Sequence, residues 1–253
     1  MGNLFENMKA LESASTLVLP SAPFAVFRYD GVGFSKYTKR FQAPEDALFM
    51  EAMDRAAQRL MEQFSALGAY VVSDEISLFL KAGKDGSLAH GGNVVKTASI
   101  GAGILSASFT ATFPDSPAAF DGRGFALEND EMLRQYLVSR MRSGYKNSVS
   151  MVAHHLVPGS HKKIMGIPTS ERLSFLADHG IDFEKAVTPG FTYGRLLFKE
   201  SATKTVSFFN KKTKVEEVVS VVRKETRKEV ADFAKVKHQE DVPFDASAFF
   251  LRG

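Results

Sequence analysis

The chain has 253 residues, which is long enough for one large domain or for one domain with an extension. Its content of 44% hydrophobic and 24% charged residues, with 22 Phe, is typical of a globular protein with a substantial core and excludes wholesale disorder. The absence of Cys excludes disulfides, Cys-ligated zinc, iron–sulfur clusters and a cysteine nucleophile, and the net charge of +3 is too small to indicate a partner.

No stretch of the sequence approaches the roughly 20 apolar residues that span a bilayer. The N-terminal segment carries one basic residue, Lys9, before a short mixed apolar run, which is unlike a signal peptide. We therefore expect a cytoplasmic protein with no membrane partner.

The first elements in chain order are a strand and a helix. Residues 24–29 (FAVFRY) form a short apolar run that ends at the turn dipeptide Asp30-Gly31, which predicts a strand. Pro44 is placed at the first turn of a helix, where proline is favoured. Apolar residues then recur with a period of 3.6 residues as far as Leu67, and Gly68 is expected to end this helix.

Residues 69–73 and 76–80 read as two strands, with only Asp74 and Glu75 between them, so we expect a hairpin. A small-residue helix over 93–113 and a strand over 120–127 follow. The order β-α-β-β-α-β predicts an α+β fold, a ferredoxin-like βαββαβ palm.

The second half predicts a helical and β-hairpin C-terminal extension. Asn129 opens a long helix with one apolar stripe, and Pro158-Gly159 ends it. A shorter helix is expected over 169–179, and strands are expected over 191–198, 205–210 and 216–222. We expect a palm domain over 1–145 and the extension over 146–253, packed on the palm, although one interlocked domain is also compatible with the pattern.

Charge is distributed unevenly along the chain. Residues 195–240 hold twelve Lys or Arg and seven Asp or Glu, so this region carries +5 and the remainder carries −2. Such a basic run can contact a nucleic-acid backbone, but its interleaved Glu residues make a solvated face equally compatible.

Three carboxylates are predicted to meet at one edge of the sheet. Asp30 ends the first strand, and Asp74 and Glu75 lie between the second and third. In this topology the first and third strands are neighbours, so the three side chains come within reach of one another. Mutual repulsion would raise their pKa values unless cations neutralise them, and two Mg²⁺ ions would suit this purpose. Each motif alone is also a common solvated turn, and it is the combination that favours a metal site.

Other residues are candidates for binding a nucleotide. Gly31 and Gly33 permit close approach of the backbone, so the amides of residues 30–35 could cradle a triphosphate. Arg28 and Lys96 could pair with phosphates or be ordinary surface charges. His154 and His155 are adjacent and would point about 100° apart on a helix, so we interpret them as surface residues.

Four segments, in order, resemble the tRNA-His guanylyltransferase superfamily: FRYDGVGFSKYTKRF, APED, SDEISLFL and FDGR. These enzymes add nucleotides to RNA 5′ ends in the 3′-to-5′ direction. The resemblance implies that Asp30 and Asp74 ligate two Mg²⁺ together with the Gly31 carbonyl, and that Glu75 assists at the same centre. It also implies that GTP and ATP are substrates, and that the protein is a homo-oligomer, a tetramer or a dimer. The nucleotide-binding residues implied in addition are Arg28, Val32, Gly33, Phe34, Ser35, Asp46, Ser73 and Lys96.

The sequence also departs from the family pattern. The H-I-N-N-L-Y-N segment of eukaryotic members corresponds here to residues 145–151, where only Asn147 persists. Ala43 stands where the family tends to have Lys. We therefore expect 5′-end repair or extension of tRNA or a tRNA-like RNA rather than strict addition of one G, with RNA contacts from Asn147, Lys211, Lys212 and Lys214. The alternatives are a palm-fold cyclase or oligonucleotide synthetase acting on free nucleotides, and a non-catalytic RNA-binding relative.

Overall fold

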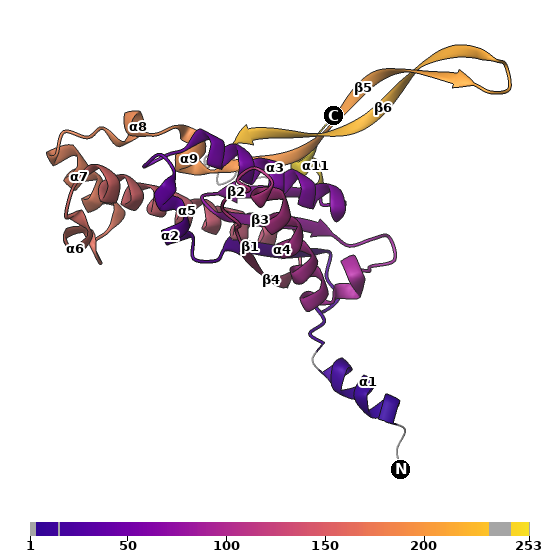
Figure 1. Cartoon of the computed structure of the whole chain (residues 1–253), viewed down its shortest axis with the longest axis horizontal. Coiled ribbons are helices and arrows are strands. Elements are labelled where there is room, and N and C mark those ends of the chain that lie inside the picture. The colour runs from indigo at the N-terminus through magenta and orange to yellow at the C-terminus, as the bar shows by residue number, and fades with distance from the viewer. Residues whose placement is uncertain (1–3, 15, 233–243, 253) are drawn as a thin grey trace.

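The computed structural model describes residues 4–14, 16–232 and 244–252 of the chain. Within them a single sheet runs in the order β4-β1-β3-β2-β5-β6, and β7 pairs with β5 (Figure 1). All pairs are antiparallel except β5 with β7. The strands are β1 (Phe24–Gly31), β2 (Gly68–Val72), β3 (Glu75–Lys81), β4 (Phe120–Leu127), β5 (Arg195–Asn210), β6 (Val215–Val230) and β7 (Leu251–Arg252). The predicted mixture of helices and antiparallel sheet is confirmed.

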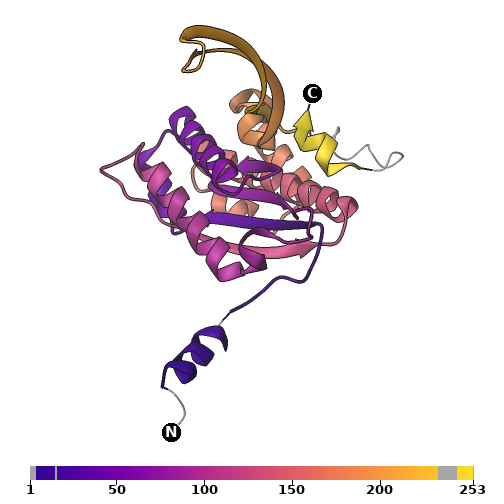
Figure 2. The ribbon, with the colours of Figure 1, turned by 90° about the vertical axis from the view of Figure 1, so that its right-hand side faces the viewer.

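The longer helices are layered on the two faces of this sheet (Figure 2). On one face α3 (Ala47–Gln63) and α4 (Val94–Thr110) bury a cluster with the inward side chains of β1, such as Phe27. On the other, α5 (Asp130–Leu156) and α11 (Ala246–Phe250) bury Phe24 and Val26. Because successive strand residues point to opposite faces, β1 serves both cores, which is why residues 24–27 are all apolar.

The second half of α5 packs in a third cluster with the short helices that follow it. None of the described helices is long and apolar enough to cross a membrane. The remaining helical segments are α1 (Leu4–Ala14), α2 (Phe34–Tyr37), η1 (Thr38–Arg40), η2 (Ala89–Gly92), α6 (Ser160–Ile164), α7 (Thr169–Asp178), α8 (Phe183–Ala186) and α9 (Pro189–Tyr193).

Both predicted ends of the first core helix were wrong. The helix α3 begins after Asp46, whose Oδ1 accepts a hydrogen bond from the Phe49 amide at 2.8 Å, so Pro44 precedes the helix. Gly68 lies in β2, where a Cβ atom would come 2.1 Å from the Phe250 ring. The glycine therefore allows α11 to approach the sheet closely, and it does not end a helix.

The turn of the hairpin is displaced by one residue from the predicted one. Ser73 and Asp74 form the turn between β2 and β3, and Glu75 is the first residue of β3. Ser73 adopts the left-handed region, with φ 51°. Because Glu75 belongs to β3 and not to the turn, its side chain points to one face of the sheet.

The predicted C-terminal strands are longer and more continuous than expected. Phe191 belongs to α9, and β5 begins at Arg195 and runs unbroken to Asn210. The strands β5 and β6 pair along their full length, and beyond the sheet they continue as a two-stranded ribbon (Figure 1). We call residues 201–224 the arm. Residues 233–240 of the basic region lie outside the described residues.

The sheet and α5 both cross the position of the expected domain boundary. Residue 145 lies within α5, and β5 pairs with β2 through Ala69 and Leu197. The two parts of the chain therefore share one sheet.

A buried ion pair connects this added part of the sheet to α3. The Oδ1 atom of Asp54 accepts a hydrogen bond from Nε of Arg195 at 2.6 Å, and its Oδ2 accepts one from Nζ of Lys228 at 2.7 Å. The side chains of Asp54 and Arg195 are only 7% and 5% exposed. Removing one partner would leave a charge in a site with little water to solvate it.

We expect Asp54→Ala to lower the free energy of unfolding by about 3 kcal/mol, because Arg195 is then left buried without its carboxylate. The matched control is Glu51→Ala, one turn away on α3, where an exposed pair with Arg55 at 3.7 Å should contribute less than about 1 kcal/mol. Chemical denaturation of the three proteins measures the difference. Equal losses for the two variants would contradict this role of Asp54.

Candidate functional site

The site begins with the register between β1 and β3. Their pairing ends at Tyr29 and Ile76, so the next step of the register places Asp30 beside Glu75. Phe24 and Val26 of β1 face α5, and alternation places Arg28 and Asp30 on the same side. The first and third strands are neighbours, as expected, and the acidic ends of both reach one edge of the sheet.

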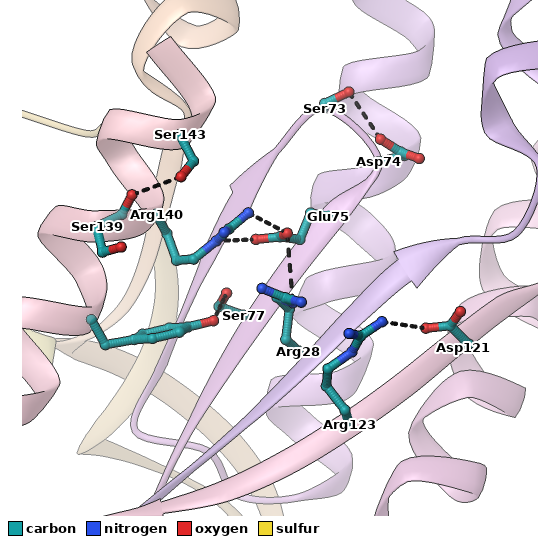
Figure 3. A network of polar contacts seen from close by, with 11 residues as sticks. Arg28, Ser73, Asp74, Glu75, Ser77, Asp121, Arg123, Ser139, Arg140 and Ser143 are labelled. Carbon is teal, nitrogen blue, oxygen red and sulfur yellow. Dashed lines mark hydrogen bonds and ion pairs between the residues drawn. The ribbon is translucent and has the colours of Figure 1, made fainter. Parts of the chain in front are cut away.

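Asp74 is placed at this edge by the turn between β2 and β3. The Ser73 hydroxyl donates a hydrogen bond to Oδ1 of Asp74 at 3.0 Å (Figure 3). Burial raises the pKa of Asp74, and the negative charge of Asp30 raises it further. A buried carboxylate beside a second acid is a costly arrangement, which a cation would relieve.

Glu75 points away from Asp74 and toward two arginines (Figure 3). Arg140 on α5 donates to both oxygens of Glu75, from Nε at 2.8 Å and from Nη2 at 2.5 Å. The Nε atom of Arg28 lies 3.7 Å from the same carboxylate. Burial raises the pKa of Glu75, while the two arginines act in the opposite direction. Glu75 therefore joins the sheet to α5 and already has cationic partners, whereas Asp74 experiences the negative charge of Asp30.

Arg140 was not among the residues predicted from the sequence, although a signal for it exists. Leu133, Leu137, Met141 and Gly144 are buried along α5, and Arg140 follows Leu137 by three residues, on the same stripe. A charged residue on an otherwise apolar stripe requires a buried partner. The sequence alone does not show that this partner is Glu75, which is 65 residues away.

A cavity of about 640 Å³ opens beside these carboxylates. Its floor includes Gly144, where a Cβ atom would lie 2.7 Å from a methyl group of Val72, so this glycine lets α5 cross β2 closely. Large apolar side chains also line it, and we call them together the apolar wall: Phe34, Phe41, Phe49, Met50, Met151 and Phe191. The acidic turn and this apolar wall therefore bound one space.

The structure brings together eight of the predicted site residues as the lining of this cavity: Asp30, Phe34, Ser35, Asp46, Ser73, Asp74, Glu75 and Asn147. Asn147, predicted as an RNA contact, thus shares the cavity with the predicted catalytic acids. Asp46 has both oxygens engaged, because Oδ2 accepts a hydrogen bond from the Gln42 amide at 3.0 Å in addition to the helix-capping bond. Its role in the structure is to fix the start of α3.

The structure does not bring the other predicted residues into the cavity lining, namely Arg28, Gly31, Val32, Gly33, Lys96, Lys211, Lys212 and Lys214. The Val32 amide donates to the Ala119 carbonyl at 2.9 Å, so it does not point into a phosphate cradle. Gly33 has φ 70° and allows the turn from β1 into α2. Lys96 is exposed in the first turn of α4.

The three lysines of the arm lie at its tip, between β5 and β6. Two further charged or titratable residues also reach the cavity. His155, interpreted as a surface residue, is exposed and lines it, and so does the buried Arg195.

Few side chains at the cavity could act as ligands of a metal ion. Among the described residues, no group of three or more His, Asp and Glu side chains is arranged to hold a metal ion. Asp30 and Asp74 form an acidic pair, and backbone carbonyls and ligand oxygens would have to complete any coordination sphere. Mg²⁺ is typically bound in this way, through one or two carboxylates and substrate phosphates.

Comparison with known proteins gives several matches. The family model described as tRNAHis guanylyltransferase matches residues 5–128. The tRNA(His) guanylyltransferase of Schizosaccharomyces pombe is 32% identical over 143 residues, which cover 53% of this chain and 53% of that protein. An uncharacterized protein of Acanthamoeba polyphaga mimivirus is 26% identical over 181 residues, covering 60% and 62%. The chain therefore spans between half and two thirds of the length of these curated relatives.

Solved structures match over more of their length. A bacterial tRNA(HIS) guanylyltransferase-like protein in complex with ATP is 27% identical, with a TM-score of 0.70 over 77% of this chain and 88% of that one. A bacterial structure of the same description in complex with GTP is 23% identical, with a TM-score of 0.71 over 94% and 96%, and shows likeness of fold. The motif segments, the sheet that carries them and these matches place the chain, through residues 5–128, in the tRNA-His guanylyltransferase superfamily.

Proposed function

We propose that this protein is a Mg²⁺-dependent nucleotidyltransferase that adds nucleotides in the 3′-to-5′ direction to the 5′ end of tRNA or a tRNA-like RNA. The observation that carries the proposal is the acidic pair Asp30 and Asp74 at one end of a nucleotide-sized cavity. The superfamily membership supports it, as do relatives described as a tRNA(His) guanylyltransferase and as a protein in complex with ATP. In this proposal residues 1–145 are the catalytic palm, which the strand order β4-β1-β3-β2 supports.

The residues at the cavity suit Mg²⁺. Asp30 and Asp74 would hold it, with the Gly31 carbonyl. Burial and the negative charge of Asp30 raise the pKa of Asp74, and a bound cation would offset both effects. Bound Mg²⁺ would supply neutralisation of phosphate charge, which displacement at phosphorus requires. The chain's own contribution is to hold Asp30 at the end of β1 and Asp74 in the turn that leads into the neighbouring strand β3.

Two charged residues have a positioning role in this proposal. Arg140 holds both oxygens of Glu75, so Glu75 fixes the start of β3, and with it Asp74, against α5. Arg28 contacts the same carboxylate, and its buried Nε atom has no hydrogen-bond partner in the structure. Glu75 thus supports the acidic pair through Arg140 and Arg28.

The cavity also accounts for substrate binding in this proposal. GTP or ATP would place its triphosphate at Asp30 and Asp74, near the backbone of Ser35, and its base against the apolar wall. RNA would enter past Asn147 on α5, and the lysines of the arm would contact its phosphates.

The central test is Asp74→Asn, assayed with a labelled nucleoside triphosphate, Mg²⁺ and a 5′-truncated tRNA. We expect at least about a hundredfold reduction of transfer, because charge neutralisation at the reacting phosphate is removed. In metal-free buffer the same variant should unfold at a higher temperature than the wild type, because its buried like-charge repulsion with Asp30 is removed.

The matched control is Asp115→Asn, an exposed acid in the loop after α4, which should leave transfer and melting unchanged. Full transfer by Asp74→Asn would overturn the assignment of the acidic pair. A labelled product of free nucleotides, with none on RNA, would favour a cyclase or oligonucleotide synthetase, and no product at all would favour a non-catalytic RNA-binding relative.

A second prediction concerns Arg140. We expect Arg140→Gln to reduce kcat with little change in KM for RNA, and to lower the free energy of unfolding by about 2 kcal/mol, because Glu75 loses its bidentate partner. Arg59→Gln changes an exposed arginine on α3 and should do neither. Steady-state kinetics with denaturant unfolding measure both effects. A change confined to KM would instead indicate that Arg140 binds substrate.

The arm provides a third prediction. Replacement of Lys211, Lys212 and Lys214 by Ser should weaken RNA binding and reduce the slope of log affinity against log salt by up to about 3, roughly one unit for each phosphate that the protein no longer neutralises. Titration of a labelled tRNA at several salt concentrations measures this slope. An unchanged slope would assign the three lysines to a solvated turn.

A further inference from the structure

The arm presents an unpaired strand edge. β6 pairs with β5 on one side and is the last strand in the order of the sheet, so its other edge has no strand partner among the described residues. The centre of this edge, residues 218–222 (VVSVV), contains no charge and no proline, and Val218, Val219 and Val222 are exposed. An exposed edge of this kind normally carries protective charges, and without them it tends to pair with another strand.

The sequence of this edge is complementary to itself. Residues 216–224 (EEVVSVVRK) are centred on Ser220. The first and second residues on either side of Ser220 are all Val. The third and fourth residues are acidic on one side and basic on the other. In an antiparallel pair of two β6 strands centred on Ser220, Glu217 opposes Arg223 and Glu216 opposes Lys224. Residues opposite each other have the same parity, so each pair of side chains shares a face of the sheet, as pairing requires.

The outer edge of β5 lacks this property. Residues 201–210 include Lys204 but no acidic residue, so pairing of that edge with itself would bring together no opposite charges. Hydrogen bonds within the arm leave the β6 charges available. Both hydrogen bonds to the Glu217 carboxylate, from Asn210 and Thr213, end on Oε1. The acids Glu216 and Glu217 also disfavour a phosphate backbone along this segment.

We propose that the β6 edge is the interface to a second copy of this chain, with the two arms joined antiparallel about Ser220 in one sheet of order β5-β6-β6-β5. The self-pairing segment lies in the part of β6 that extends beyond the body (Figure 1). β7 pairs with Lys199 and Glu200 on the β5 side, so the opposite edge of β6 stays accessible to the second copy. An isolated two-stranded ribbon is only marginally stable in water, and a sheet of four strands is more stable.

A disulfide test uses the absence of cysteine from the chain. With Ser220→Cys as the only thiol, the two sulfurs lie at the two-fold axis, on Cα atoms about 4.5–5.5 Å apart, so mild oxidation should give a covalent dimer. The matched control is Thr205→Cys, the exposed residue opposite Ser220 on β5. Its two copies would be three strands apart, roughly 14 Å, which is beyond the about 7 Å limit for a disulfide. Cross-linking of both variants, or of neither, would overturn the proposal.

Charge reversal tests the register by a readout independent of catalysis. Sedimentation of the full wild-type chain should give twice its 27.8 kDa mass or a multiple of that dimer. Glu216→Lys alone and Lys224→Glu alone each set like charges opposite each other twice per dimer, and each should weaken association about tenfold. The double variant restores opposite charges and should restore association. A monomeric wild type, or a double variant as weak as the single ones, would contradict the pairing.

Discussion

The electrostatic balance at the turn between β2 and β3 is the constraint on which the site depends. The register of β1 with β3 brings Asp30, Asp74 and Glu75 to one edge of the sheet, where burial removes much of the water that would solvate them. Arg140 and Arg28 balance Glu75. The remaining acidic pair keeps its mutual repulsion, which the proposed Mg²⁺ would relieve.

This balance requires α5 to lie close to the sheet. Gly144 permits the approach by leaving room for Val72, and the same approach brings Arg140 within reach of Glu75. A longer side chain at position 144 would separate the helix from β2 and weaken the arginine contact. Gly144 thus sets the distance between α5 and β2, and the ion pair of Arg140 with Glu75 sets the orientation of the Glu75 side chain.

Local patterns predicted much of the fold and the acidic pair, because strand periodicity, caps and turn residues are read from neighbours in sequence. Asp30 and Asp74 were found in this way, and so was the start of α4 at Asn93, which caps it. Gly68 was misinterpreted because the reason for a glycine there is Phe250, which lies far along the chain in α11. Arg140 was missed for the same kind of reason, since its partner comes from another element. Asp46, which the resemblance implies as a nucleotide contact, lines the cavity, and both of its oxygens also accept backbone hydrogen bonds at the start of α3.

The arm would connect the two proposals, RNA binding and the pairing of two chains. In the pairing centred on Ser220, Lys214 of one copy lies opposite Thr226 of the partner subunit, beyond the nine self-complementary residues and toward the partner's sheet. The basic tip of each arm is then delivered to the body of the other copy, and away from its own cavity. An RNA bound at one cavity would therefore meet lysines supplied by the second copy. In this arrangement the arm of a single chain extends away from its own acidic pair (Figure 1). Two paired chains would therefore offer the RNA both an acidic pair and a set of lysines close to it, which gives the unprotected edge of β6 a function.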